Sequence, residues 1–211
     1  MIKIKRTNRL KITYPYILGK QFNPFNIKYN LRIIQFNKLV DTYFSNYVLL
    51  KDGWRLNNES AEIMAREYPE WKYYLPPFNL KDKVILDVGA GCGETARYFL
   101  LNGAERVICI ENNEECLRYL GVNSYRGNIF VIPLDFSIDM LSDIDYDYCK
   151  IDIEGYEALI INGYEKGIIK LNMLKSMVIE CHSIYCINKF KEMGFKEIHS
   201  WRNDLKIMAN W

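Results

Sequence analysis

Acidic side chains stand at the ends of four apolar segments, where they could gather around one ligand. They are Asp87, Glu111, Asp135, and Asp152 together with Glu154. An unpaired carboxylate is costly to bury, so packing does not account for this repetition. Carboxylates pair with positive charge and accept hydrogen bonds from hydroxyl groups. The pattern therefore predicts a ligand that carries both.

The first of these segments runs into a glycine-rich turn, DVGAGCGET, at residues 87–95. A Walker-type phosphate loop needs Lys followed by Ser or Thr after its last glycine, but Gly93 is followed by Glu94 and Thr95. The dinucleotide fingerprint is G-x-G-x-x-G or A, whereas the spacing from Gly89 is G-x-G-x-G, with Glu94 in the place of the third glycine. A carboxylate there would repel a pyrophosphate and tolerate a cationic ligand without phosphate.

Alternating apolar runs and helical patterns after residue 80 predict the elements that would position these residues. Apolar runs joined by helices indicate a parallel sheet that is covered on both faces. The last two runs, 195–201 and 205–211, are too close for a parallel crossover, so we expect a hairpin whose last strand enters the sheet antiparallel. The predicted fold class is α/β, a Rossmann-like doubly wound sheet. The other strands are expected at 84–89, 106–111, 128–135, 147–155 and 176–182.

The region before this domain has a different character. We expect a basic N-terminal extension with helices and a hairpin at residues 1–79, followed by the main domain at 80–211. Residues 1–40 contain nine Lys and Arg and no acid, so residues 41–211 carry −7 of the formal total of +2 (+2 − 9 = −7). Such an arm can bind phosphate on RNA or a membrane surface, or pack on the core or a partner. Asp52-Gly53 predicts the hairpin turn, and Asn58 or Ser60 is the expected N-cap of a helix that ends or kinks near Pro69.

Composition limits the remaining possibilities. No apolar run reaches the roughly 20 residues that span a bilayer, and no signal peptide is recognisable at the start, so we expect a cytoplasmic protein. The six cysteines form no CxxC or Cys/His pattern, which argues against a disulfide framework and a zinc site. Asp152 and Glu154 alone are few ligands for a divalent cation, so no metal is expected.

The glycine turn followed by Glu111 resembles the nucleotide motifs of class I S-adenosylmethionine-dependent methyltransferases, over about residues 80–211. The resemblance implies S-adenosylmethionine as cofactor, with Glu111 and the neighbouring Asn112 at the ribose. It also implies that Asp135 faces the adenine amino group, with Phe136 nearby. The turn residues that would lie against the methionine portion are Asp87, Gly89, Ala90, Gly91, Gly93 and Glu94.

A second stretch, KIDIEGYE at 150–157, resembles the FkbM-type methyltransferases when Gly163 and Glu180 are included. Members of that family methylate hydroxyl oxygens on sugars or natural products, so the resemblance implies O-methylation of a small molecule or sugar. Methyltransferases that act on base nitrogens usually carry Asn or Asp, then Pro-Pro and an aromatic residue, which this stretch lacks.

The acceptor side would need a base, because a protonated alcohol is a poor nucleophile. Asp152 and His182 end neighbouring predicted strands, so either is a candidate base, and Glu154 is expected to orient the acceptor. Three alternatives stay open: an RNA methyltransferase that uses residues 1–40, a nicotinamide-dependent oxidoreductase, and a protein that binds the cofactor without turnover.

Overall fold

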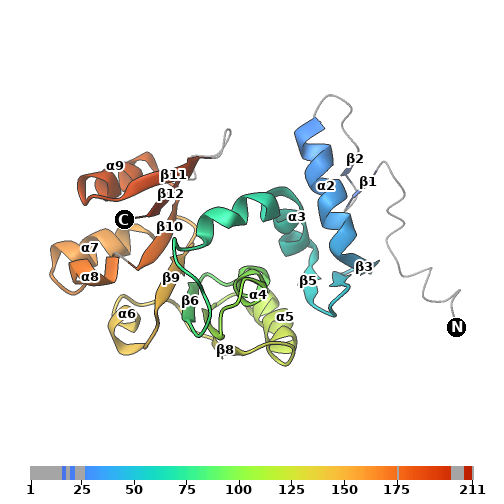
Figure 1. Ribbon diagram of the computed structural model, residues 1–211, viewed down its shortest axis with the longest axis horizontal. Helices are drawn as coiled ribbons and strands as arrows, with labels where there is room; N and C mark the ends of the chain where they lie inside the picture. Colours follow the sequence, from blue (N-terminus) through green and yellow to red (C-terminus); the bar gives the residue numbers. More distant parts are fainter. Residues whose placement is uncertain (1–15, 18–19, 22–26, 175, 201–206, 211) are drawn as a thin grey trace, which may run out of the picture.

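The computed structural model describes residues 16–17, 20–21, 27–174, 176–200 and 207–210. Its centre is a seven-stranded sheet in the order β11-β12-β10-β9-β6-β7-β8 (Figure 1). The strands β8, β7, β6, β9 and β10 are parallel to one another, whereas β12 is antiparallel to both β10 and β11. The α/β fold class and the antiparallel last strand are therefore confirmed. The bounds are β6 Val84–Val88, β7 Arg106–Ile110, β8 Ile129–Ile132, β9 Tyr148–Ile151, β10 Met177–Cys181, β11 Lys196–Ser200 and β12 Ile207–Asn210.

Helices cover both faces of the sheet, as the apolar strands require. Every residue of β9 and β10 is buried, which is the pattern of a parallel sheet that is covered on both sides. One face packs on α4 and α5, and the other packs on α6, α7 and α9. In Figure 1, α7, α8 and α9 lie together beside β10. The bounds are α4 Glu94–Leu101, α5 Glu114–Ser124, α6 Met140–Asp143, α7 Ala158–Glu165, α8 Leu171–Leu174 and α9 Ile184–Glu192.

The N-terminal region contributes to the same core as α4 and α5. Leu56, Met64 and Trp71 are buried in one cluster with Ile85 and Phe99. Strands β4 and β5 pair antiparallel across the turn at Asp52-Gly53, so that hairpin is confirmed. The bounds are β1 Tyr16–Ile17, β2 Lys20–Gln21, α2 Ile27–Leu39, β3 Val40–Tyr43, β4 Tyr47–Leu50, β5 Arg55–Asn57, α3 Asn58–Glu67 and the 3-10 helix η1 Tyr68–Tyr74.

One boundary differs from the sequence prediction. The N-cap of α3 is Asn57, whose backbone is extended and whose side-chain Oδ1 accepts a hydrogen bond from the backbone N–H of Ser60. Neither Asn58 nor Ser60 therefore has that role. The end of the helix is as predicted, because α3 gives way to η1 at Tyr68-Pro69. Among the described residues, no helix combines the length and the apolar character that crossing a bilayer would require.

Side chains alternate between the two faces of a strand, and this places three charged residues on one face. Asp87 lies opposite Lys150 in the register of β6 and β9, and Glu180 follows Ile179, which lies opposite Ile151. The residues on either side of each of them pack in the cluster of α6, α7 and α9. Asp87, Lys150 and Glu180 therefore point to the face that the N-terminal region and α4 cover.

Candidate functional site

The glycine turn between β6 and α4 has a backbone that only glycine adopts readily. Gly89, Gly91 and Gly93 all have φ between +57° and +86°. At Gly89 there is a second requirement, because an added Cβ would lie 1.7 Å from the carbonyl oxygen of Asp152. The turn after β6 thus touches the backbone at the end of β9. This is the point where the strand order reverses, and ligands of open α/β sheets bind there.

The Glu111 carboxylate links this turn to the end of β7. Its Oε2 accepts a hydrogen bond from the backbone N–H of Gly91 at 2.8 Å, and its Oε1 accepts from the amides of Asn112 and Asn113 at 2.9 and 2.8 Å. The exposed Asn112 side chain donates to Asp135, beyond β8. The carboxyl edge of β6, β7 and β8 therefore carries a continuous row of polar groups, as the sequence predicts.

Asp87 lies beneath the turn and is fully buried. Its Oδ2 accepts from the hydroxyl of Thr95 at 2.6 Å, and its Oδ1 lies 3.3 Å from Nζ of Lys150. Lys150 also donates to the carbonyl of Gly89 at 2.9 Å. Burial raises the pKa of Asp87, and Lys150 and Thr95 only partly oppose it. For Lys150, burial lowers the pKa, but Asp87, Asp152 and Glu180 outweigh it and the pKa is raised. The Asp87–Lys150 pair thus supports the turn from below.

The Glu94 carboxyl group also lies under the turn. Its Oε1 is 2.8 Å from the place that a Cβ on Gly91 would take, and the residue is buried. Burial raises its pKa to about 7. The Glu94 carboxyl group therefore carries less negative charge near neutral pH than an exposed carboxylate would, and it is buried beneath the turn, so it opposes a pyrophosphate less than the sequence indicates.

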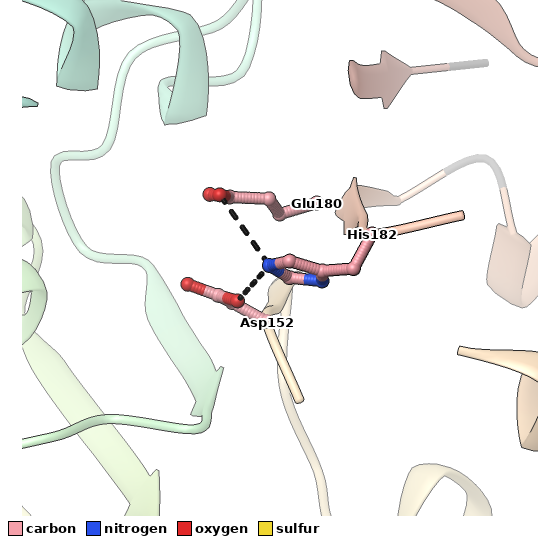
Figure 2. A group of neighbouring side chains, drawn as sticks. All are labelled: Asp152, Glu180 and His182. Carbon is pink, nitrogen blue, oxygen red and sulfur yellow. Dashed lines mark ion pairs between the residues drawn. The ribbon is translucent and has the colours of Figure 1, made fainter. Parts of the chain in front are cut away.

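A second group of residues lies where β9 and β10 end, as Figure 2 shows. Nε2 of His182 lies 3.6 Å from Oδ1 of Asp152, 3.6 Å from Oε2 of Glu154 and 3.7 Å from Oε1 of Glu180. Nδ1 of His182 is hydrogen-bonded to Oε1 of Glu157 at 2.7 Å. The structure therefore brings together Asp152, Glu154 and His182, the three residues expected on the acceptor side.

Buried partners fix the charge and orientation of this group. Burial lowers the pKa of His182, but the hydrogen bond to Glu157 and the charges of Asp152, Glu157 and Glu180 outweigh it and the pKa is raised. Burial raises the pKa of Glu157, yet the hydrogen bond from His182 lowers it below its ordinary value. Glu180 accepts a hydrogen bond from the hydroxyl of Tyr74 in η1. Burial and then the charge of Glu180 raise the pKa of Tyr74.

The loop that carries Asp152 and Glu154 is sharply bent. Glu154 has φ +49° and Gly155 has φ +99°, both in the left-handed region. The bend lets the Gly155 amide donate to Glu157 at 2.9 Å, while the Glu154 side chain stays 74% exposed. Glu154 therefore lies at the rim of the group and Asp152 lies inside it.

The two polar groups are continuous, and residues without a predicted role connect them. Lys150 lies 3.6 Å from Asp152 as well as beside Asp87. Glu157 and Glu180 belong to the pattern that resembles FkbM-type proteins, but the sequence gives them no task. Tyr74 has no sequence signal at all. A charged residue inside an otherwise apolar strand is the signal that marks Lys150 and Glu180.

No protein-family profile matches this chain. The protein named 158B of Sulfolobus islandicus rod-shaped virus 1 is 33% identical over 55 residues, which is 26% of this chain and 35% of the viral protein. The chain thus matches about a third of the length of that relative.

Several solved structures have a similar chain path. They include precorrin-6Y C5,15-methyltransferase from Geobacter metallireducens, with a TM-score of 0.49 and 16% identity over 69% of this chain and 87% of that one. Ribosomal protein L11 methylase from Lactobacillus delbrueckii has a TM-score of 0.46 and 14% identity over 71% of this chain and 77% of that one. Magnesium protoporphyrin IX methyltransferase from Synechocystis, with S-adenosylmethionine bound, has a TM-score of 0.47 and 13% identity over 72% and 83%. At these identities the likeness concerns the fold alone.

Proposed function

We propose that this protein is a methyltransferase that uses S-adenosylmethionine and methylates a hydroxyl oxygen. The observation that carries the proposal is the contact between the two polar groups. The turn that Glu111 holds through Gly91 touches Asp152 through Gly89, and Asp152 lies beside His182. A methyl donor on the first group would therefore lie next to a candidate base in the second.

The residues of the donor side suit an adenosine that carries no phosphate. Glu111 offers two carboxylate oxygens to the ribose hydroxyls at the end of β7. Asn112 would lie at the ribose as well and donates to Asp135, which forms the outer part of the row where the adenine amino group would lie. Phe136 is partly buried beside Asp135. The turn from Gly89 to Gly93 offers its backbone to the amino acid portion. The surrounding carboxylates favour the positive charge of the sulfonium and of the ammonium group.

The acceptor side would supply orientation and a base. Methyl transfer is an in-line displacement in which the acceptor oxygen attacks the methyl carbon and the neutral thioether leaves. Asp152 or His182 would take the acceptor proton, a contribution of typically 10²- to 10⁴-fold in rate. Glu157 holds Nδ1 of His182, so Nε2 faces the acceptor side. Glu154 at the rim would orient the acceptor, and close in-line positioning would supply much of the remaining rate enhancement.

Exposed aromatic rings favour a small-molecule or sugar acceptor, as the FkbM-type resemblance implies. Tyr156 follows the bent loop after β9, and Tyr185 lies in the first turn of α9 after β10. Their exposed fractions are 70% and 59%. Aromatic faces at the ends of the two acceptor strands give an apolar surface on which a sugar ring can pack.

A titration calorimetry experiment with the intact chain tests the proposed cofactor. We expect S-adenosylhomocysteine to bind in the micromolar range, at about −8 kcal/mol, and NAD to show no measurable heat of binding. Binding of NAD alone would contradict the proposal and favour the nicotinamide oxidoreductase. If neither compound bound, the proposed binding site for the methyl donor would be contradicted.

RNA is the second candidate acceptor, because residues 1–40 hold nine basic residues and no acid. Most of these side chains lie outside the described residues; Arg32, which is described, pairs with Glu70 and donates to the carbonyl of Arg66. A gel-shift series with tRNA at increasing salt distinguishes the two acceptors. A basic arm that tracks phosphates would lose affinity steeply as salt rises. We expect feeble binding that does not depend on salt. This result would contradict an RNA acceptor and favour a small-molecule acceptor.

A further inference from the structure

Three side chains from the ends of β9 and β10 converge on one point, as Figure 2 shows. One donor atom each from Asp152, Glu180 and His182 lies within 4.8 Å of the others. Nε2 of His182 is 3.6 Å from Asp152 and 3.7 Å from Glu180. Metal–ligand bonds of about 2.1 Å place two ligands of one ion about 3–4 Å apart. The two separations from Nε2 of His182 are therefore those of ligands that share an ion, and the donor atoms of Asp152 and Glu180 lie within 4.8 Å of each other.

The orientation of the His182 imidazole is also typical of a metal ligand. Nδ1 of His182 is bonded to Oε1 of Glu157 at 2.7 Å, and Glu157 is fully buried. Metal-ligating histidines almost always donate their second ring nitrogen to a carboxylate or carbonyl in this way. The arrangement leaves Nε2 to face Asp152, and neither Nε2 nor Oδ1 of Asp152 has a hydrogen-bond partner within the described part of the chain, although both atoms are buried.

Negative charge also gathers at this point. Lys150 supplies the ammonium group in this connected group of described residues, and five residues supply carboxyl groups: Asp87, Asp152, Glu154, Glu157 and Glu180. Asp87, Glu157 and Glu180 are fully buried. Buried carboxylates need compensating cations, and a divalent ion would supply two charges at the place where the donor atoms meet.

We propose that Asp152, Glu180 and His182 bind one divalent cation and that Glu157 positions the histidine. Two carboxylates and one imidazole suit Mg²⁺, Mn²⁺ or Zn²⁺, and three protein ligands leave open positions for water or an acceptor oxygen. The proposal goes beyond methyl transfer, since it needs no methyl donor. The sequence expectation of no metal counted only Asp152 and Glu154, and the two further ligands come from β10 and the residue that follows it.

The cation would change the role of His182. When Nε2 binds the ion, it cannot also accept a proton from the acceptor. The ion itself would bind the acceptor hydroxyl and lower the pKa of that hydroxyl, which is the usual effect of a bound divalent cation on coordinated oxygen. The released proton would pass to the exposed carboxylate of Glu154, whose Oε2 lies 3.6 Å from Nε2 of His182. Asp152 and His182 would then act together as ligands.

Binding of Mn²⁺ to the full chain, followed by electron paramagnetic resonance of the free ion, tests the site. We expect one Mn²⁺ per chain in the wild type. Asp152→Asn and His182→Ala should each weaken binding at least about 100-fold, and Glu157→Gln should weaken it about 10- to 100-fold. The matched control is Asp145→Asn, the same change at an exposed loop position, which should leave binding unchanged.

The outcomes separate this proposal from the proposed cofactor. Wild-type protein that binds no Mn²⁺, or that binds it equally well after Asp152→Asn, would overturn the metal site. S-adenosylhomocysteine should still bind the same samples with at most a modest change in affinity, because none of the three ligands belongs to the donor row around Glu111. Thermal unfolding of each variant identifies any that is misfolded, and the isosteric Asp152→Asn keeps the test decisive if His182→Ala does not fold.

Discussion

Replacing Glu111 by alanine is expected to abolish binding of S-adenosylhomocysteine at the concentrations at which the wild type is saturated. The side chain would bond the two ribose hydroxyls, and each hydrogen bond to a charged group contributes about 1.5–3 kcal/mol. Losing both removes about 3–6 kcal/mol, which is a 100- to 10,000-fold loss of affinity. Titration calorimetry measures the change directly.

Two comparisons make this result specific. Glu114→Ala removes an acid from the exposed start of α5, three residues away, and should leave the affinity unchanged. Glu111 also accepts a hydrogen bond from the backbone N–H of Gly91. The thermal unfolding of Glu111→Ala therefore distinguishes the loss of a contact to the ligand from a disruption of the glycine turn. Near-normal binding by a folded Glu111→Ala protein would contradict the assignment of the ribose site.

The second large effect is expected on stability, from Lys150→Met. Lys150 is 1% exposed, and its ammonium group lies beside Asp87, which is fully buried. Removing one partner of a buried ion pair leaves an uncompensated charge and typically lowers the free energy of unfolding by about 3–5 kcal/mol. The free energy of unfolding of a typical domain is only about 5–15 kcal/mol. The hydrogen bond to the Gly89 carbonyl is lost as well. Urea unfolding measures the free energy of unfolding of each variant.

The double variant Lys150→Met with Asp87→Asn distinguishes the charge effect from lost packing. Asp87→Asn removes the buried carboxylate that Lys150→Met leaves without its ammonium partner, and the side-chain amide oxygen at position 87 would still accept a hydrogen bond from the hydroxyl of Thr95. We expect the double variant to be more stable than Lys150→Met alone. A double variant that is less stable than either single one would show that the pair does not hold the turn as an ion pair. Lys166→Met, at an exposed position, is the control and should change the free energy of unfolding little.

The sequence predicts the sheet well, because local patterns determine it. The apolar runs of β9 and β10 are uninterrupted, and the short link between the last two strands allows only a hairpin. Asp152 and His182 are placed together from strand order alone, since parallel strands end at the same edge. The boundaries are less certain, because Asn57, Asn58 and Ser60 are all good caps and backbone angles decide among them.

The sequence could not predict that the three proposed metal ligands lie together. Glu180 lies within an apolar strand, and only its register opposite β9 brings it to the level of Asp152. Tyr74 reaches Glu180 from 106 residues away, through a 3-10 helix whose position the core determines. The direction of the Glu94 side chain could not be predicted either. The sequence places Glu94 at the start of the helix, whereas its carboxyl group lies beneath the turn, beside Gly91.

The contact between Gly89 and the carbonyl of Asp152 has a thermodynamic consequence. Because no side chain separates the two backbones, a shift of the Asp152 loop on binding an ion or acceptor moves the turn that faces the donor. The affinities of the two sites are then linked, and linkage is reciprocal. If the cation tightens donor binding by a given factor, the donor tightens cation binding by the same factor. The contact at Gly89 would thus couple the occupancy of one site to the occupancy of the other.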